Sequence, residues 1–486
     1  MYEIGGPLNF GPPDGQILSV GERDCIGVNL PTPIVNSGDQ SPDFVFYERW
    51  VPEQEGIQLD SVDPILHSPT AGRCEKQTGS PKSCKIGGTR QQSSEGKPMS
   101  NDTLKLNDRE VLQYTRETLQ AHLPLHAAGY RCTTDDLFNV LLGVAAGRGT
   151  VESVCADLAG SPDAETLRGY LHEQLCVEDL PDLAEDLNAA LADEIPRRVW
   201  RQPPEVAIDF QDRPYYGKTP QGEGLWVRGR AHDGTPRFYR IATAYVMRHG
   251  LRVTLALRFV LPGDTIVSVV DDLLKRLKTL GIRVACLYLD KGFGGVSVLD
   301  YLTRHEQPAL IACTLRGKTG GTRALCRGHK SYRTTYTFID AQGQPFTAEL
   351  AVCRVFTTAK RTKRMKRRAD WLIFILIHLD LSPRQARRLY RRRVGLESSY
   401  RCAGQVRGWT ASNNPAYRFV LLALSFILLN VWIHLRWLFT QVPRRGRRRL
   451  DTKRLQLTRL AKFIVRALEQ LYGCVREIEA PAIPRL

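Results

Sequence analysis

Apolar and polar positions follow a helical period in the first part of the chain after residue 107. The apolar residues recur at helical spacing, and Thr133–Asp136 offers caps before one of these segments. The predicted helices are Asp108–His122, Leu137–Gly147, Thr150–Leu158, Asp163–Leu175 and Leu180–Ile195. We expect residues 107–196 to form a small helical domain. It is either a plain bundle or a DNA-binding helix-turn-helix with Asp163–Leu175 as the recognition helix.

Beyond Pro204 the pattern changes to short apolar runs that are bounded by turn residues, which is typical of strands. The predicted strands are 206–210, Phe238–Val246, Leu251–Val260, Ile282–Leu289, Ala309–Thr314, Tyr332–Ile339, Phe346–Phe356 and Asp370–Leu379. Helices are expected at Thr265–Leu280, at Gly294–Arg304, and from the cap Ser382 onward through Glu397. This alternation predicts an α/β domain around a mixed sheet over residues 205–476.

Two stretches differ from the rest of the chain. Residues 1–100 are rich in Gly and Pro and keep no period, so we expect a disordered or extension segment without assigned chemistry. Tyr417–Phe439 has the length of a membrane span. It contains the polar residues Arg418, Asn430, His434 and Arg436. They favour a buried helix of a soluble core, with a membrane-associated protein as the alternative.

The charge of the chain points to a polyanionic partner. Its 486 residues contain 68 Lys+Arg against 51 Asp+Glu, a net charge of +17. The excess lies in three basic runs, Lys360–Arg368, Arg384–Arg407 and Arg444–Arg454. Nucleic acid and an anionic membrane surface are the two partners that fit such a charge.

The cysteines and the N-terminus indicate a cytoplasmic protein. The 12 cysteines include no C-x-x-C pair and no zinc-ligand spacing, and only Cys74 and Cys84 lie in a loop-like segment where they could pair. We therefore expect mostly reduced, buried cysteines. No basic region followed by an apolar one opens the chain, so we expect no secretory signal.

Three carboxylates stand where a site of an α/β protein forms. Asp209 is expected at the C-terminal end of its strand, Asp290 directly follows another strand, and Glu397 lies on a helix. Acids that converge repel one another unless cations neutralise them, and oxygen ligands suit Mg²⁺ or Mn²⁺. Two such ions could bind both the attacking and the leaving oxygens of a phosphoryl transfer. Alternatively, the aspartates are turn or cap residues and an arginine neutralises Glu397. Asp212, which competes with Asp209, is expected to shape the turn before Gly217.

These residues resemble the insertion-sequence DDE transposases. The IS-four superfamily among them has a signature of tyrosine, two residues, arginine, three residues, glutamate, six residues and lysine. Tyr390, Arg393 and Glu397 fit it, and Gly404 stands in the place of the lysine. The phrases AIDFQDRPYYG, LYLDKGF and RVGLESSYRCAGQVR look like the ISH-three-like branch of that superfamily. The resemblance covers about residues 107–476.

The resemblance implies a ribonuclease H-like catalytic core, with Asp209, Asp290 and Glu397 as catalytic ligands of Mg²⁺ or Mn²⁺, two ions in all. It implies DNA-end contacts by Tyr390 and Arg393. The neighbouring DNA-binding candidates are Arg401 and Arg407, of which Arg407 is the candidate for the lysine's phosphate contact. Trp409 either packs in the structure or stacks on an unpaired base.

The strand-rich piece at about 309–379 resembles the β-insertion of this superfamily. Its basic run is either a solvated hairpin tip or a contact with the DNA backbone through Lys363, Arg364, Lys366 and Arg367. The implied function is a DNA transposase that cuts the ends of its element and joins the 3′-hydroxyl ends to target DNA. It would act as a homodimer on double-stranded DNA, in the cytoplasm at the nucleoid. The alternative is an inactive or repurposed DNA-binding protein derived from a transposase.

Overall fold

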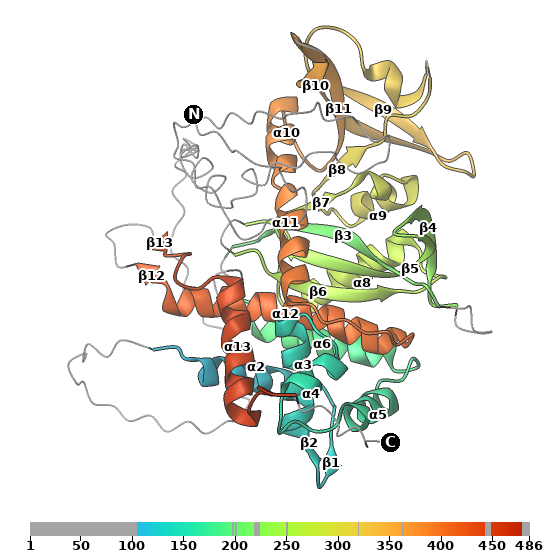
Figure 1. The fold of residues 1–486 in the computed structure, drawn as a ribbon. Helices are drawn as coiled ribbons and strands as arrows, with labels where there is room; N and C mark the ends of the chain where they lie inside the picture. The colour runs from blue at the N-terminus through green and yellow to red at the C-terminus, as the bar shows by residue number, and fades with distance from the viewer. Residues whose placement is uncertain are drawn as a thin grey trace, which may run out of the picture. The chain divides into compact units, whose positions relative to one another are not determined.

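The computed structural model describes residues 105–196, 199, 202–217, 224–248, 251–318, 320–361, 364–442 and 449–478 (Figure 1). For residues 357–361, 364–368, 394 and 449 the description covers the backbone alone. The segment 1–100, which we expected to be disordered, and its cysteines Cys74 and Cys84 lie outside these residues. Contacts join the chain from Pro98 to Leu486 into one unit.

The helices predicted over residues 107–196 are present, with ends that differ by a few residues. They are α2 (Asp108–Gln120), α3 (Thr134–Gly147), α4 (Val151–Asp157), α5 (Ala164–Gln174) and α6 (Leu180–Asp193). Side-chain caps begin several of these helices. The side chains of Asn107, Thr133 and Thr150 each accept a hydrogen bond from the backbone amide three residues further along the chain. A short hairpin of β1 (Ala128–Gly129) and β2 (Cys132–Thr133) precedes α3. Whether this region forms a separate DNA-binding domain stays a prediction.

The strands of the second region form the predicted mixed sheet. Its strands are β3 (Glu205–Pro214), β4 (Val227–His232), β5 (Thr235–Val246), β6 (Thr254–Val260), β7 (Cys286–Leu289), β8 (Ala309–Cys313), β9 (Tyr332–Ile339), β10 (Pro345–Arg361) and β11 (Arg364–Ile377). The chain first makes the antiparallel neighbours β3, β5 and β6, and then adds β7 and β8 parallel to β3. The mixed α/β class predicted from the pattern is thereby confirmed.

Helices cover both faces of this sheet. Two of them, α8 (Ile266–Thr279) and α9 (Val296–Arg304), connect β6 to β7 and β7 to β8. Their buried residues share a core with Val206 and Ile208 of β3. Ala207, between those two, belongs to a second core together with Leu396. The alternation of side chains along β3 therefore places two separate cores on the two faces.

The second core lies under α10 (Pro383–Arg391) and α11 (Val394–Ala403), which follow one another along the sheet (Figure 1). One continuous helix from Ser382 through Glu397 was expected, and that prediction is wrong. The amides of Arg392, Arg393, Gly395 and Leu396 bond to carbonyls three residues earlier, so the helix tightens and breaks at 392–393. The cap itself, Ser382, is as predicted.

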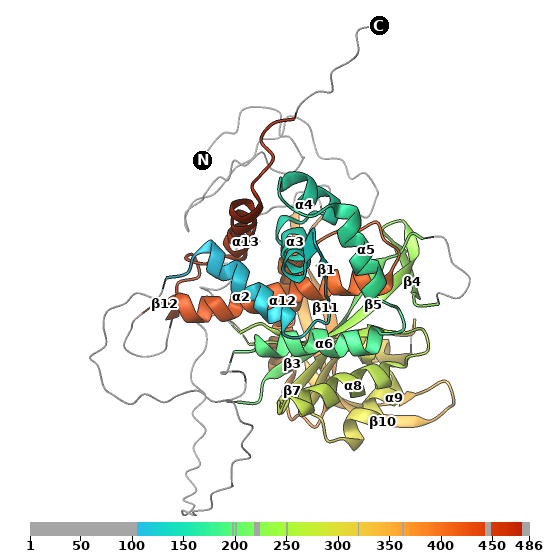
Figure 2. The same cartoon turned by 90° about the horizontal axis from the view of Figure 1, so that it is seen from below.

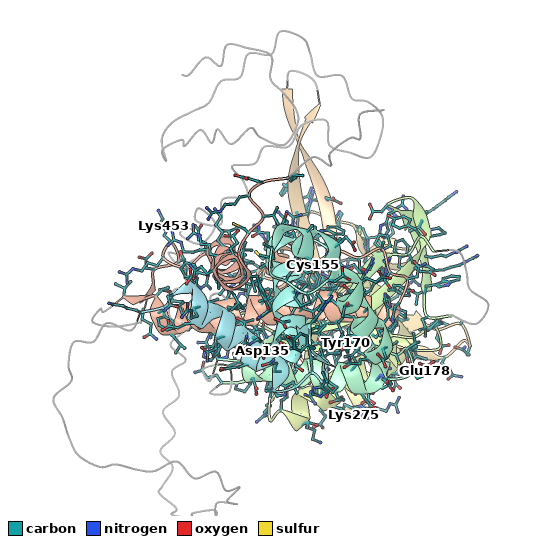
Figure 3. The ribbon with its side chains drawn as sticks, turned by 60° about the horizontal axis from the view of Figure 1, so that its bottom comes forward. Asp135, Cys155, Tyr170, Glu178, Lys275 and Lys453 are labelled. Carbon is teal, nitrogen blue, oxygen red and sulfur yellow. The ribbon has the colours of Figure 1, made fainter. Side chains whose placement is uncertain are left out.

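Antiparallel strands extend the sheet beyond β8. β11 pairs with β8, β10 with β11, and β9 with β10. The region expected as a β-insertion thus continues the same sheet, and β8 itself pairs with β7. The far ends of β10 and β11 pair only with each other, and this two-stranded ribbon extends past the helices (Figure 3).

The apolar segment that imitates a membrane span is α12 (Pro415–Phe439). It is long and apolar enough to cross a membrane, yet 83% of its most apolar window is buried inside the structure. It lies beside α6 (Figure 2). Asn430 donates to the carbonyl of Thr254 at 2.8 Å and accepts from its amide at 3.0 Å. This burial and bonding favour the core helix that the polar residues predicted.

The C-terminal part of the chain returns to the helical region. α13 (Leu457–Tyr472) packs against α2 and α3. The hydroxyl of Tyr472 donates to Asp136 at 2.6 Å and accepts from Asn139 at 3.0 Å. A two-stranded pair of β12 (Gln441–Val442) and β13 (Arg449–Leu450) lies between α12 and α13 in the chain.

Candidate active site

Asp209 and Asp290 are brought together by the register of two parallel strands. The last paired residues of β3 and β7 are Ile208 and Leu289, and each aspartate is the next residue of its chain segment. Asp209 was expected at the end of its strand, which is wrong, because β3 continues to Pro214. Asp209 instead lies at the point where the parallel pairing with β7 stops. The predicted approach of these two aspartates is therefore borne out by the strand register.

Arg393 lies between the two acids. Its Nη2 is 2.9 Å from Oδ2 of Asp209, and its Nη1 is 3.8 Å from Oδ1 of Asp290. The shorter contact has the distance of an ion pair without the angles of a hydrogen bond, and Nε and Nη2 of Arg393 are buried with no hydrogen-bond partner. The guanidinium is therefore held by charge more than by directed bonds.

The charges of this group are not balanced. Burial raises the pKa of Asp209 to about 6, and the carboxylates of Asp290 and Glu397 add to the rise, while Arg393 opposes it. Burial works against the charged form of Arg393, but Asp209, Tyr390 and Asp290 together raise its pKa. One guanidinium thus stabilises two carboxylates only in part, and the site retains negative charge.

Tyr390 holds the end of α10 against the end of β7. Its hydroxyl donates to the carbonyl of Leu289 at 3.2 Å and lies 3.5 Å from Oδ1 of Asp290. Its ring packs on Phe374, with 4.9 Å between the ring centres. In the structure Tyr390 and Arg393 therefore contact the acids, and their predicted contact with DNA stays a prediction.

Glu397, the third expected ligand, is an exposed residue of α11 about one turn beyond Arg393. It is near enough to raise the pKa of Asp209. Within the described parts of the chain, however, no group of three or more His, Cys, Asp or Glu side chains is placed to hold a metal ion. Because Glu397 is exposed, packing does not prevent its side chain from turning toward the two aspartates.

The donor chemistry of these residues fits the expected metal. All three side chains offer carboxylate oxygens, which are the ligands that Mg²⁺ and Mn²⁺ prefer. Two carboxylates face one guanidinium, so the acid pair carries net negative charge that a cation would relieve. Asp209 and Asp290 are the two residues that are already adjacent, and the metal site itself remains a prediction.

Glu205 is a residue of this region that the sequence reasoning missed. It lies on the same face of β3 as Asp209, four residues earlier, and pairs with Arg392 at 3.0 Å. It also accepts a hydrogen bond from Tyr288 at 3.1 Å. Two consecutive arginines at the break between α10 and α11 thus pair with two acids of one strand. The adjacent arginines in the sequence were the signal, but nothing local identified their partners.

Asp212, the competitor of Asp209, has a different role from the predicted one. It lies inside β3 and not in a turn, and it forms a bidentate ion pair with Arg240 of β5, with both distances 2.7 Å. Three residues after Asp209, it points to the other face of the sheet. Strand alternation therefore separates it from the acid pair.

The remaining predicted DNA-binding residues are spread over two places. Arg401 is an exposed residue in the last turn of α11, and Arg407 is half-buried, 4.5 Å from the ring centre of Trp409. Arg364, Lys366 and Arg367 lie on β11 near the end of its pairing with β10, where their backbone alone is described. Lys363 lies outside the described residues. Their contact with DNA stays a prediction.

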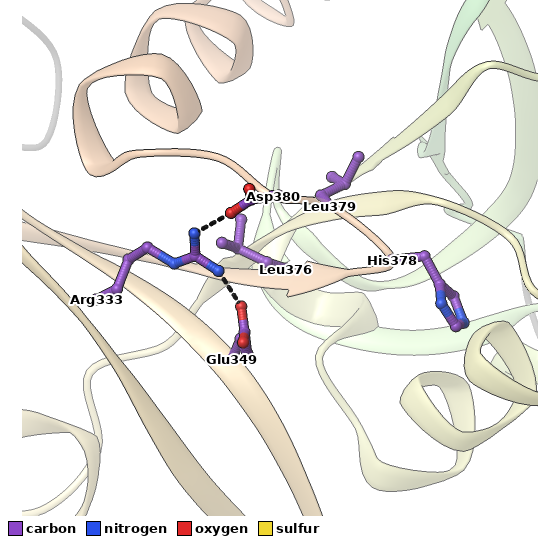
Figure 4. A pocket seen from close by; sticks show the side chains of 6 residues that line it. All are labelled: Arg333, Glu349, Leu376, His378, Leu379 and Asp380. Carbon is purple, nitrogen blue, oxygen red and sulfur yellow. Dashed lines mark hydrogen bonds and ion pairs between the residues drawn. The ribbon is translucent and has the colours of Figure 1, made fainter.

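A separate pocket lies on the added strands, and none of the predicted site residues lines it (Figure 4). Its charged groups pair with one another, since Arg333 contacts both Glu349 and Asp380. Because these three charged side chains pair with one another, none of the three indicates a binding or catalytic role for this pocket.

Comparison with solved structures found a partial similarity in fold. No family model matches the chain, and no curated protein matches it. A solved structure, the cryo-EM structure of a piggyBac transposase synaptic complex with hairpin DNA, is similar with a TM-score of 0.44 and 10% sequence identity. The similarity covers 75% of this chain and 77% of that one. The function proposed below is built on this chain's own side chains and not on that similarity.

Proposed function

We propose that this protein is an insertion-sequence transposase of the DDE type, which cleaves DNA strands at the ends of its element and joins them to target DNA. The observation that carries the proposal is the acid pair of Asp209 and Asp290, with Arg393 between them. This arginine belongs to the same tyrosine, arginine and glutamate spacing that resembles the transposase signature.

The order of the acids supports a ribonuclease H-like core. With the short β4 left aside, Asp209 lies on the first strand of the sheet and Asp290 follows the fourth, while Glu397 lies on a late helix. That is the order which the resemblance implies. The three antiparallel strands followed by two parallel ones bring the first and fourth strands side by side, as such a site requires.

In this proposal Asp209, Asp290 and Glu397 hold Mg²⁺ or Mn²⁺, in two sites. A metal held there would make a hydroxide or an activated 3′-hydroxyl available near neutral pH and would stabilise the leaving oxygen. The protein positions the strand, and Arg393 neutralises phosphate charge once its carboxylates are occupied. Tyr390 fixes α10 against the end of β7 and so keeps Arg393 over the acids.

The test is cleavage of supercoiled plasmid DNA by the purified full chain in Mg²⁺ or Mn²⁺. We expect nicking that Asp209→Asn and Asp290→Asn each reduce at least a hundredfold, with duplex binding retained. Asp300→Asn is the matched control, because Asp300 is a partly exposed acid of α9 paired with Arg304, outside the acid pair. Nicking that survives in both site variants would overturn the assignment.

Strand joining needs a substrate that carries the element's own ends. Duplexes taken from the DNA on either side of the coding region, labelled at the 3′ end, are the substrates to use. We expect the label to move into a target plasmid, and two ends held together predict a dimer on DNA. Cleavage without transfer of the label would leave a nuclease and would contradict the transposase assignment.

A second candidate is a DNA-binding protein that no longer cleaves. It is favoured by the position of Arg393, which already partly neutralises both aspartates, and by Glu397, which is exposed and forms with them no metal-holding group among the described residues. Duplex binding without nicking in Mn²⁺, equal in the parent and in Asp290→Asn, would establish this alternative.

A further inference from the structure

Three arginines from distant parts of the sequence form a cationic group beyond the acid pair. Arg213 lies on β3, on the same face as Asp209 and four residues further on, about 13 Å along the strand. Arg407 follows α11, and Arg148 ends α3. The charge of Arg407 acts on Arg213, and that of Arg148 acts on Arg407. The three guanidinium groups therefore share one region.

The segment that carries Arg407 is fixed against the segment that carries Arg148. The amide of Trp409 donates to the carbonyl of Gly149 at 2.8 Å. Gly408 leaves no room for a side chain, because a Cβ there would lie 2.3 Å from Cγ1 of Val144 in α3. The helical region and the segment after the Glu397 helix thus meet at a close backbone contact, and an arginine adjoins this contact on each side.

These cations have no carboxylate to neutralise them. In the described part of the chain, no acid forms an ion pair with Arg148, Arg213 or Arg407. Arg213 donates to Gln211 at 2.8 Å, but its buried Nε has no hydrogen-bond partner. Burial, together with repulsion from Arg407, lowers the pKa of Arg213 to about 9. Arg213 is only partly exposed to solvent, and a partly desolvated cation without a carboxylate costs stability, so an anion from outside the chain is the missing partner.

The chemistry of that anion follows from the donors. Guanidinium groups bind phosphate oxygens through paired N–H bonds, and three of them fit a phosphodiester or an inorganic phosphate. Arg407 also lies over Trp409, whose side chain is 49% exposed, so the group opens to solvent on at least one side. A strand that passes the acid pair would reach this group within a few nucleotides.

We infer that Arg148, Arg213 and Arg407 form a binding site for a backbone phosphate of the DNA strand that enters the acid pair, and that the helical region supplies one wall of this site. This inference rests on the proposed function for the identity of the strand. It assigns Arg148 and Arg213 to DNA binding, and it makes the close contact of α3 with Gly408 part of the substrate path.

The experiment measures duplex affinity against salt concentration in EDTA, so that cleavage does not enter. Each lost phosphate contact lowers the slope of log K against log salt by about 0.9. Because the three arginines share one phosphate, we expect Arg213→Gln and Arg407→Gln each to lower the slope by up to that amount and to weaken binding several-fold. Arg304→Gln, an exposed arginine of α9 paired with Asp300, is the control and should change neither quantity.

Stability provides a second readout that a merely structural arginine would not give. Arg213→Gln removes a partly buried charge that no acid neutralises, so its melting temperature should rise while its DNA affinity falls. Arg148→Gly should fold at least as well as the parent, because Arg148 has a left-handed backbone with φ of 56° that glycine prefers. It should nevertheless bind DNA more weakly.

The outcomes separate this inference from the proposed function. A salt slope unchanged in all three arginine variants overturns the phosphate site, whatever the nicking assay shows. If inorganic pyrophosphate binds the three arginines without competing with duplex DNA, they form a free-anion site, and this result also overturns the inference. A lowered slope together with absent nicking supports the phosphate site and contradicts only the catalytic proposal.

Discussion

Arg393 and Asp209 form an ion pair of 2.9 Å between Nη2 and Oδ2, and this pair joins the break between α10 and α11 to the interior of β3. Asp290 lies on the other side of the same guanidinium. One cation therefore faces two carboxylates, and the helix that carries Glu397 is oriented by this contact.

Arg393→Gln should make the stability of the protein depend on a divalent cation. Without the guanidinium, Asp209 and Asp290 repel each other, and we expect the free energy of unfolding at pH 8 to fall by about 2 kcal/mol. Mn²⁺ that binds the folded acid pair should restore part of this loss. The measurement is the melting temperature with and without Mn²⁺, with Arg304→Gln as the control. An equal loss in both conditions would contradict a cation site at these acids.

Gly404→Lys should be tolerated, although it places a large side chain at the position where the resembling superfamily has lysine. Gly404 has helical dihedral angles, and nothing lies within 4 Å of a Cβ built there. We expect an unchanged or slightly higher free energy of unfolding, and a salt slope of DNA binding that steepens by about 0.9. Gly404→Ala separates the charge from the backbone effect.

Gly408→Ala is the opposite case. Its Cβ would lie 2.3 Å from Val144 Cγ1 and 3.3 Å from the Val144 carbonyl oxygen. We expect a loss of about 1–3 kcal/mol in the free energy of unfolding, because the segment cannot move away without breaking the Trp409–Gly149 bond. Denaturant unfolding of both glycine variants tests this, and equal stability of Gly408→Ala and the parent would show that the contact is loose.

Glu194 should make the protein less stable as the pH rises from about 4.5 to about 7. Burial raises its pKa to about 7, and the nearby Asp193 adds to the rise, although Thr118 and Tyr114 donate hydrogen bonds to it. Between the unfolded and folded pKa values the folded state binds the extra proton, so the free energy of unfolding falls with rising pH, by about 3 kcal/mol in all.

Glu194→Gln should remove this dependence. The glutamine carries no charge at any pH; its amide oxygen can still accept from one of the two hydroxyls, while its NH2 is a donor and faces the other. Urea unfolding at pH 5 and pH 8 measures the difference for each protein. A parent protein with equal stability at the two pH values would show that the carboxylate is solvated.

Asn430→Leu distinguishes a core helix from a membrane helix. The substitution makes α12 more apolar, which favours membrane insertion. In the structure, however, it leaves the amide and carbonyl of Thr254 and the carbonyl of Leu191 without their partner. We expect a loss of about 2–4 kcal/mol in stability and a soluble parent protein. The membrane alternative would be favoured if the parent protein partitioned into the detergent phase and if Asn430→Leu accumulated in membranes to a higher level than the parent.

Local patterns predicted most elements of this fold, because caps and apolar spacing act over a few residues. The break at Arg392 and Arg393 was not predictable, since the segment contains no proline there and the single nearby glycine, Gly395, does not by itself require a break. The pairing of these arginines with Glu205 and Asp209 is a contact across nearly two hundred positions. Similarly, Asp209 and Asp212 look alike in sequence, and only the full length of β3 shows that they lie on opposite faces.

The sequence by itself determined the order of the three acids, the spacing of Tyr390, Arg393 and Glu397, and the helical and strand periods. The tertiary structure decided which charges meet. The register of Ile208 with Leu289 places Asp209 beside Asp290, and the packing of Gly408 on α3 brings Arg148 toward Arg407. Strand register and close packing depend on the free energy of the whole fold, so no local pattern contains them.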